Sequence, residues 1–417
     1  MSSSGTTDPA PGGGSSAARP RIDVVYFDAG SGHRSGALGL AAALERQFDV
    51  DARAVDILDV IRGHRVFHST VRAGIDYFNF WLRRERVWDL KGLINLSLIC
   101  HDLVSHRGEA SIAEYWKAAP PASVVSVTPM YNPVLARALH RVRPNAPYVV
   151  VPVDFEEGKP RYWFDGGSDL HYVLTQPRQR EQAIARGVAP ERIGMASGMV
   201  VDPAFHDAPT IDRENALIEL GLDPERPTGV VSFGGQGSVL VEECVRALEM
   251  VERPLNLIVL CGRHAALHER LGELPSRHRL LVLGFQPEPP VLHHQVADFL
   301  IGKPGSMTIT EGVLTGTPVL AIRARGMWVV QRGNERWLEE KGAGEVVPTP
   351  RDLPAAVQRV LSHPDLPVRL DRLRHDGVFS AARLIGEISG LETTEHCRRP
   401  GKVLEALSAA AETKGMW

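Results

Sequence analysis

The residues best suited to chemistry lie in one stretch, GKPGSMTITEG at 302–312, which follows a short apolar run of strand length. Gly305 belongs to a small turn, and a helix is predicted to begin at Ser306. The unpaired N–H groups and the positive dipole end of a helix N-terminus attract phosphate. Glu311, about one turn into this helix, could accept two hydrogen bonds from a ribose diol. The alternative is an ordinary strand, turn and helix of an α/β domain.

A second candidate is a histidine in a glycine-rich turn near the start of the chain. RIDVVYFDA at 21–29 is predicted as a strand from its β-branched and aromatic content, and ALGLAAALERQF at 37–48 as a helix. The turn between them, GSGHRSG at 30–36, contains His33. A histidine with a pKa near 6.5 can take a proton from a hydroxyl group at neutral pH. The alternative is that His33 only caps its turn.

The same order of strand, glycine turn and helix recurs at 229–238, where GVVSFGGQGS precedes a predicted helix at 239–252. Apolar runs predict further strands at 50–58, 122–129, 147–155, 171–176, 255–264, 280–285, 296–301 and 343–347, and a further helix at 352–362. Strands that alternate with helices indicate parallel sheets. We therefore predict an α/β protein with two doubly wound, Rossmann-like domains that face a cleft.

Polar residues follow two of these strands. Tyr131 and Asn132 come just after the strand at 122–129, and Asp154 lies at the end of the strand at 147–155. Ligands of open α/β sheets bind at the carboxyl ends of the strands, so these three residues are candidates for a site. The alternative for Asp154 is a structural role.

Length and composition narrow the class of protein. The 417 residues suggest two or three domains, and a net charge of −3 gives no electrostatic case for nucleic acid. The four cysteines show no zinc-binding spacing, which suits a reducing compartment. His264 and His268 are spaced to share a metal ion, but a third ligand is missing nearby, so we predict no metal site. No uncharged apolar run is long enough to span a membrane.

Residues 64–105 mix aromatic and basic side chains on segments predicted to be helical. They include Phe67, Tyr77, Phe78, Phe80, Trp81 and Trp88, interleaved with Arg65, Arg72, Arg83, Arg84, Arg86 and Lys91. This mixture suits a membrane–water interface or a lipid headgroup. The alternative is a pair of amphipathic helices that bury their aromatic side chains in the core.

Five segments in order resemble the GT-B glycosyltransferases that include the monogalactosyldiacylglycerol synthases, the processive diacylglycerol glucosyltransferases and the peptidoglycan N-acetylglucosaminyltransferase. They are DAGSGHRSGA at 28–37, VPVDFEEGKPRYWFDGGSDLHYVLTQ at 151–176, FGGQGS at 233–238, GKPGSMTITEGVLTGTPVLA at 302–321 and QRGNERWLEEKGAGEVV at 331–347. The resemblance covers roughly residues 22–385. It implies an enzyme that moves a hexose or N-acetylhexosamine from a UDP-sugar to a lipid or other membrane-associated acceptor.

The resemblance also implies roles for single residues. His33 would be the general base or a ligand of an acceptor phosphate, and Asp154 would orient His33 or the acceptor. Glu311 would bind the ribose, and Phe285 would pack near uracil. The predicted donor-binding residues are Gly235, Gly237, Ser238, Phe285, Gly305, Ser306, Met307, Glu311, Gln331 and Asn334, of which Gln331 and Asn334 would bind the sugar hydroxyls. The predicted acceptor-binding residues are Gly30, Gly32, Trp88, Tyr131 and Asn132.

Members of this family invert the anomeric centre and use the UDP-sugar as co-substrate without a bound metal or other cofactor. The low-complexity composition of residues 1–20 predicts a disordered tail, and residues 386–417 are predicted as a helical tail. The resemblance implies an acceptor-binding domain at 21–205 and a UDP-sugar-binding domain at 206–385. We expect a cytoplasmic protein, with possible contact to the inner face of the membrane through residues 64–105. The chain could instead act on a soluble acceptor, or could be a UDP-sugar-binding protein or epimerase of the same fold.

The chain departs from the family pattern at three places. An aspartate, Asp28, replaces a small residue of the first turn, and EEGKPRYW at 156–163 is more acidic than the family segment. The family's Pro–Gly–Gln–Glu stretch reads here as ARGMWVVQRGN at 324–334. These segments are where the family recognises acceptor and sugar, so the sequence leaves both identities open.

Overall fold

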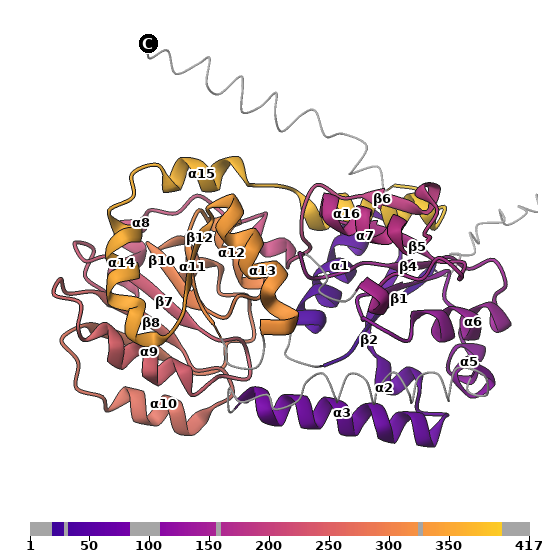
Figure 1. Ribbon diagram of the computed structural model, residues 1–417, viewed down its shortest axis with the longest axis horizontal. Helices are drawn as coiled ribbons and strands as arrows, with labels where there is room; N and C mark the ends of the chain where they lie inside the picture. The colour runs from indigo at the N-terminus through magenta and orange to yellow at the C-terminus, as the bar shows by residue number, and fades with distance from the viewer. Residues whose placement is uncertain (1–18, 29–31, 84–108, 156–159, 324–327, 394–417) are drawn as a thin grey trace, which may run out of the picture.

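The computed structural model describes residues 19–28, 32–83, 109–155, 160–323 and 328–393 (Figure 1). These residues form two parallel six-stranded sheets, each flanked by helices, in two lobes that lie side by side. The predicted fold class is therefore confirmed. Of the predicted site residues, Gly30 and Trp88 lie outside the described residues, as do the tail at 1–18 and the segment 394–417.

The first sheet has the strand order β2-β1-β3-β4-β5-β6. Its strands are β1 (Arg21–Tyr26), β2 (Asp51–Asp56), β3 (Ser123–Ser126), β4 (Tyr148–Val150), β5 (His171–Leu174) and β6 (Ile193–Met195). The central strands are short valine-rich runs that are buried along their whole length, as expected for strands covered by helices on both faces. They occupy the predicted positions, although each is shorter than predicted.

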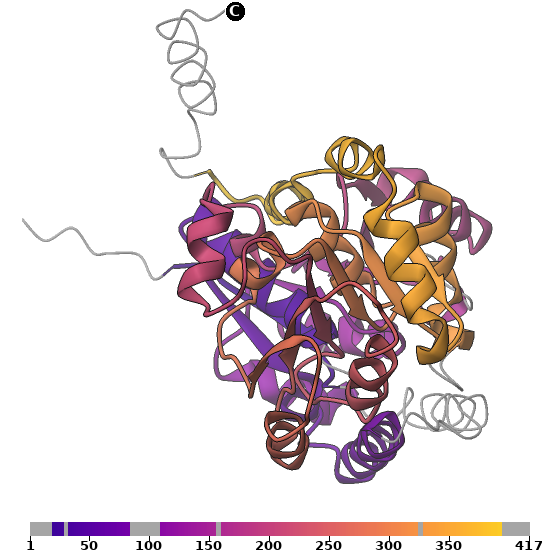
Figure 2. The same cartoon turned by 90° about the vertical axis from the view of Figure 1, so that its left-hand side faces the viewer.

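Helices follow these strands and cover both faces of the sheet. They are α1 (Gly32–Gln47), α2 (Ile57–Val60), α3 (Arg65–Arg83), α5 (Glu109–Lys117), α6 (Asn132–Val142) and α7 (Pro177–Ala185), with short 3₁₀ helices at Pro160–Tyr162, Pro190–Arg192 and Pro203–Phe205. Helix α3 runs along the lower edge of the molecule in Figure 1, on the same side as α10 (Ala265–Gly272). Figure 2 shows these two helices at the same edge from the side.

The second sheet has the order β12-β11-β10-β7-β8-β9. Its strands are β7 (Thr228–Ser232), β8 (Asn256–Leu260), β9 (Arg279–Leu283), β10 (Phe299–Gly302), β11 (Val319–Ile322) and β12 (Gly344–Val347). Its helices are α8 (Arg213–Glu219), α9 (Leu240–Leu248), α10, α11 (Val291–Gln295), α12 (Ser306–Thr315), α13 (Trp328–Lys341), α14 (Leu353–Leu361) and α15 (Leu366–Arg372), with a 3₁₀ helix at Pro350–Asp352. Helix α13 covers a stretch that was not predicted as a helix.

Each sheet has one point where the strand order reverses. In the first sheet the chain leaves β1 for β2 and returns to the other side of β1 as β3, and in the second sheet β7 and β10 are related in this way. The loops at the carboxyl ends of such strand pairs diverge and leave room for a ligand. The two glycine turns and the helix start singled out from the sequence lie at these two points.

Within the described residues, the chain passes to the second lobe between β6 and β7 and returns to the first lobe near its end. After β12 it returns through α15 to a last helix, α16 (Gly377–Ile388), which packs along α1 of the first lobe (Figure 1). The packing is close enough that a β-carbon at Gly386 would lie 2.1 Å from the Phe48 ring. The hydroxyl of Ser389 lies 2.9 Å from that of Ser123. The segment 377–385, which the sequence analysis placed in the second domain, therefore lies against the first.

Candidate active site

His33 lies in the first turn of α1, and its ring is held by a backbone carbonyl. Its Nδ1 is 2.6 Å from the carbonyl oxygen of Val127, which follows β3 at the reversal point of the first sheet. A carbonyl can only accept a hydrogen bond, so this contact requires Nδ1 to carry the proton. The other nitrogen, Nε2, is then free to accept a proton, as a general base must.

Aromatic rings flank the His33 imidazole. The Phe27 ring is stacked on it with centroids 4.4 Å apart, and the Trp163 ring is roughly parallel at 6.2 Å. Burial lowers the pKa of His33, while the Asp154 carboxylate and the bond to Val127 oppose this effect. The ring is therefore neutral at neutral pH. Phe27 and Trp163 were not predicted as site residues, although Trp163 lies in one of the segments that carry the family resemblance.

Asp154 follows β4 and receives bonds from both lobes. Its Oδ1 accepts a hydrogen bond of 3.0 Å from Nδ2 of Asn334 on α13. Its backbone oxygen accepts another from Nε2 of Gln179 on α7. The next residue, Phe155, donates its backbone N–H to Oδ1 of Asn334 at 3.0 Å. Asn334 was predicted to bind sugar hydroxyls, but in this structure its amide is engaged with residues 154 and 155.

The first turn of α12 faces the first turn of α1. Its N-cap residue is Gly305, which has no side chain to bond the free N–H groups of the helix. Met307 packs towards α1, because a β-carbon at Gly36 would lie 3.9 Å from its Cε and one at Gly32 would lie 4.0 Å from its Cγ. The Ser306 hydroxyl donates to the Val153 carbonyl oxygen of the first lobe, so Ser306 can offer a ligand its N–H but not its hydroxyl in this state.

The glycine loop after β7 forms the other side of the second reversal point. Gly237 has a φ of 72°, and a β-carbon there would lie 2.4 Å from the carbonyl oxygen of Cys261, so this position requires glycine. Ser238 is buried, and its hydroxyl accepts a hydrogen bond of 3.1 Å from the backbone N–H of Leu240. The loop can therefore approach an anion with its backbone, as predicted, whereas the Ser238 hydroxyl is already bonded.

Two residues that follow neighbouring strands form a flat platform beside this loop. Arg263, after β8, places its guanidinium 3.7 Å from the centre of the Phe285 ring, which follows β9. Phe285 is half exposed, and a β-carbon at Gly235 would lie 3.6 Å from its ring. Within the described residues, Arg263 makes no ion pair with a carboxylate. The sequence analysis predicted Phe285 and missed Arg263.

Glu311 lies one turn into α12, as predicted. Burial, with a smaller contribution from the nearby Asp202, raises the pKa of Glu311 to about 7. Among the described side chains, none gives this carboxylate a hydrogen bond or an ion pair. A half-buried carboxylate without a partner is costly, so a pair of hydroxyl donors would be a favourable ligand for it.

Two predicted acceptor residues lie in the core. Asn132 is buried, and its Oδ1 accepts bonds from the Ser126 hydroxyl at 2.6 Å and the Tyr148 hydroxyl at 3.1 Å. Its Nδ2 donates to the carbonyl of Thr128. Tyr131 is also buried and packs edge-on against Phe67. The prediction that both bind the acceptor is therefore wrong for this structure, because their side chains are already used inside the lobe.

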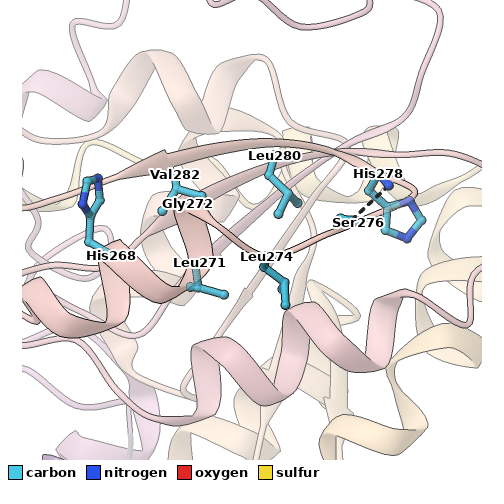
Figure 3. A pocket seen from close by; sticks show the side chains of 8 residues that line it. All are labelled: His268, Leu271, Gly272, Leu274, Ser276, His278, Leu280 and Val282. Atoms are coloured by element: carbon cyan, nitrogen blue, oxygen red, sulfur yellow. Dashed lines mark hydrogen bonds between the residues drawn. The ribbon is translucent and has the colours of Figure 1, made fainter.

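Gln331 and Gly32 are the remaining described residues of the predicted site. Gln331 lies half-buried on α13, one turn before Asn334, and Gly32 opens α1 beside His33. A separate groove of about 390 Å³ lies between α10 and β9 (Figure 3). His278 on its rim bonds the backbone of Leu248 and Leu255, which is a structural role. This groove contains none of the predicted site residues.

Known proteins resemble this chain in sequence. The chain is 26% identical over 371 residues to a probable monogalactosyldiacylglycerol synthase 2 of Oryza sativa subsp. japonica, covering 84% of this chain and 76% of the relative. It is 26% identical over 206 residues to a processive diacylglycerol beta-glucosyltransferase of Bacillus pumilus, covering 48% of this chain and 51% of the relative. This chain is therefore similar in sequence to a galactosyl transferase and to a glucosyl transferase whose names both specify diacylglycerol.

Solved structures show the same fold. The crystal structure of MurG from Acinetobacter baumannii has a TM-score of 0.54 at 16% identity, covering 88% of this chain and 99% of that one. The calicheamicin glycosyltransferase CalG4 has a TM-score of 0.54 at 17% identity, covering 90% and 98%. These similarities confirm the GT-B fold. No family model matches the chain.

Proposed function

We propose that this protein is an inverting glycosyltransferase that moves a hexose or N-acetylhexosamine from a UDP-sugar to a lipid, such as a diacylglycerol, or to another membrane-associated acceptor. The named relatives are a probable monogalactosyldiacylglycerol synthase and a processive diacylglycerol beta-glucosyltransferase, which supports a lipid acceptor. The observation that carries the proposal is the position of His33 opposite the first turn of α12. One element supplies a neutral base and the other supplies free N–H groups for a diphosphate, and Met307 packs against the turn that holds the base.

The donor would lie at the reversal point of the second sheet. The N–H groups of Gly305, Ser306 and Met307 and the loop at Gly235–Gly237 would bind the diphosphate, where the helix dipole favours negative charge. Glu311 would accept hydrogen bonds from the ribose hydroxyls, and the platform at Phe285 would support the uracil ring. The residues that would bind the sugar hydroxyls include Gln331.

The reaction would be a single displacement. Nε2 of His33 takes the proton of an acceptor hydroxyl as its oxygen attacks the anomeric carbon from the face opposite the diphosphate. The bond from the anomeric carbon to the phosphate oxygen breaks, and UDP leaves with the bonding electrons. The N–H groups at α12 and the glycine loop stabilise the negative charge on UDP. One inversion gives the opposite anomer, and His33 later returns its proton to solvent.

The structure of α3 supports a membrane-associated acceptor. Phe67 is 1% exposed and packs into the lobe, whereas Val66 is 69% exposed and Phe80 46% exposed on the other side of the helix. Exposed arginines, Arg65 and Arg72, lie on the same helix. Both interpretations of the sequence therefore apply to parts of α3, because one face belongs to the core and the other presents apolar and basic side chains. Among the described helices, none combines the length and apolar character that crossing a membrane requires.

The experiment that tests the proposal offers the full chain a panel of radiolabelled UDP-sugars with total lipid extract, followed by phase partition. We expect label in the organic phase with at least one donor and loss of this label in His33→Ala. Label that reaches only water-soluble products would favour a soluble acceptor. Conversion of the UDP-sugar without an acceptor would favour an epimerase, and binding of UDP with no conversion would favour a binding protein.

A further inference from the structure

We propose that Asn334 is a positioning residue, by which α13 of the donor-binding lobe holds Asp154 in place beside His33. This inference rests on the proposed function, since it concerns the base of that reaction. It gives Asn334 a different role from the binding of sugar hydroxyls. Asn334 and Asp154 are 180 positions apart in the chain and belong to different lobes.

The hydrogen bonds of Asn334 fix the orientation of its amide. Nδ2 donates to the Asp154 carboxylate and Oδ1 accepts from the Phe155 N–H, both at 3.0 Å. A flipped amide would place its oxygen against the carboxylate and its NH₂ group against the N–H, so only one orientation satisfies both partners. The side chain is 1% exposed. It would have to abandon two buried partners before it could bond a sugar, which is costly.

Further contacts hold the same two residues from both lobes. The Phe155 and Trp337 rings are stacked with centroids 4.1 Å apart and planes inclined by 3°. The indole N–H of Trp337 donates to Oε1 of Gln176 at 3.0 Å. The buried side chain of Gln179 donates to the backbone oxygen of Asp154. Residues 154 and 155 are thus held between α7 and α13, and of these contacts only the bond from Asn334 reaches the carboxylate.

The carboxylate that Asn334 holds acts electrostatically on His33. Its negative charge favours the protonated imidazole and so opposes the effect of burial on the pKa. This interaction depends on the distance between the two groups. Movement of Asp154 after loss of Asn334 would therefore weaken its influence on His33, and the imidazole would lose a proton more readily.

The first test is kinetic and uses the transfer assay of the proposed function. In Asn334→Ala we expect kcat to fall about a hundredfold, because small misplacements of catalytic groups have effects of this size, while the KM for the UDP-sugar changes little. The acid limb of the pH profile should move to lower pH. In an Asp154→Asn background, Asn334→Ala should add little, because both changes act through the same carboxylate. Independent, multiplicative effects or a rise in KM alone would show a sugar contact instead.

Arg178→Ala is the matched control. Arg178 on α7 forms an exposed ion pair of 3.1 Å with Glu340 on α13, so its loss weakens the same junction without touching Asp154. We expect nearly normal kcat and an unchanged pH profile. A pH profile shifted as in Asn334→Ala would mean that the packing of α13 against the first lobe in general, and not the bond to Asp154, determines the pKa of His33. If a melting curve shows that Asn334→Ala is unfolded, Asn334→Ser replaces it in the comparison with Arg178→Ala.

The second test needs no substrate and remains valid if the proposed function fails. The ring protons of His33 are followed by NMR through a pH titration of the full chain, with the resonance assigned by its loss in His33→Gln. We expect a lower pKa for His33 in Asn334→Ala than in the wild type, and a normal one in Arg178→Ala. An unchanged pKa in Asn334→Ala would overturn the positioning role, whereas absence of transfer by the wild type would overturn only the proposed function.

Discussion

Nδ1 of His33 donates a hydrogen bond to the carbonyl oxygen of Val127, and this bond joins the two loops at the reversal point of the first sheet. The carbonyl selects the tautomer with the proton on Nδ1, so the backbone leaves Nε2 as the nitrogen that would act in the proposed base. A neighbouring carboxylate usually performs this task in enzymes. In this protein Asp154 influences the ring by its charge, while the orientation comes from Val127.

His33→Ala should reduce turnover by roughly a hundredfold or more, because general-base catalysis contributes this much. The affinity for UDP, measured by calorimetry, should stay nearly normal, since His33 lies in the first lobe and the proposed UDP site lies in the second. Transfer within a few-fold of the wild type would show that His33 is structural.

The pH dependence provides a second check on His33. Burial lowers its pKa, so the neutral, active form persists below the usual titration range of histidine. The acid limb of the kcat/KM profile should therefore have its midpoint below about 6.5, with activity falling as pH drops further. A midpoint above that value would mean that the Asp154 charge outweighs burial.

Glu311 should make donor affinity depend on pH. Its pKa is raised to about 7, so the ionised fraction increases between pH 6 and pH 8. A carboxylate accepts hydrogen bonds from a diol better than a carboxylic acid does, so the affinity for a UDP-sugar should rise over this range. Glu311→Gln should weaken binding by about 1–3 kcal/mol at pH 8 and remove the pH dependence.

Glu311→Gln should weaken donor binding but increase the stability of the fold at high pH. A carboxyl group whose folded pKa lies above its unfolded value loses stability as pH rises from about 4.3 towards the folded pKa. Glu311→Gln cannot ionise, so its melting temperature should exceed that of the wild type at pH 8 and match it at pH 4. Equal melting temperatures at both pH values would mean that Glu311 has a partner for its charge.

Arg263 should bind the donor although the sequence analysis missed it. Its guanidinium lies on the Phe285 ring and makes no ion pair within the described residues, so it can turn towards a diphosphate. Arg263→Ala should weaken UDP binding by roughly 1.5–3 kcal/mol, as expected for a hydrogen bond to a charged group. The control is Arg253→Ala, which removes an exposed arginine after α9. Equal losses in both variants would indicate only a general effect of positive charge.

The strands could be predicted well from the sequence, whereas the contacts between the two lobes could not be predicted. Valine-rich runs bounded by turns predict β3, β4 and β7, and the residues that follow such strands can be assigned to the carboxyl edge. This rule also places Arg263 and Phe285 together, since they follow neighbouring strands. It could not reveal that Asn334 bonds Asp154, because that contact depends on how two separately folded lobes pack.

The direction in which side chains point was the other feature that the sequence did not predict. Tyr131 and Asn132 follow β3 as predicted, but Met130 and Tyr131 adopt φ values of 63° and 57°. Two successive non-glycine residues with positive φ are rare, and neither methionine nor tyrosine predicts such a backbone conformation. The resulting turn buries Tyr131 against Phe67 and leaves Asn132 inside the lobe. A sequence pattern can place a residue at an edge of a sheet without showing which way it points.

The two faces of α3 allow a decisive test of membrane contact. Val66→Ser, Phe80→Ser and Arg72→Glu together change its exposed face, whereas Phe67→Ser changes the buried one. Each basic residue near an anionic surface contributes about 1 kcal/mol, and salt screens this attraction. The wild type should therefore sediment with vesicles of anionic lipid at low salt and less at high salt. The exposed-face variant should lose this binding and keep its melting temperature.

Phe67→Ser should instead lower the melting temperature, because it removes a large side chain from the core. A wild type that does not sediment with vesicles at low salt would rule out membrane contact through α3. An exposed-face variant that unfolds would show that this face packs against other parts of the chain. Vesicles of neutral lipid separate the two attractive forces, since binding that persists without anionic lipid must come from the apolar side chains, Val66 and Phe80 among them.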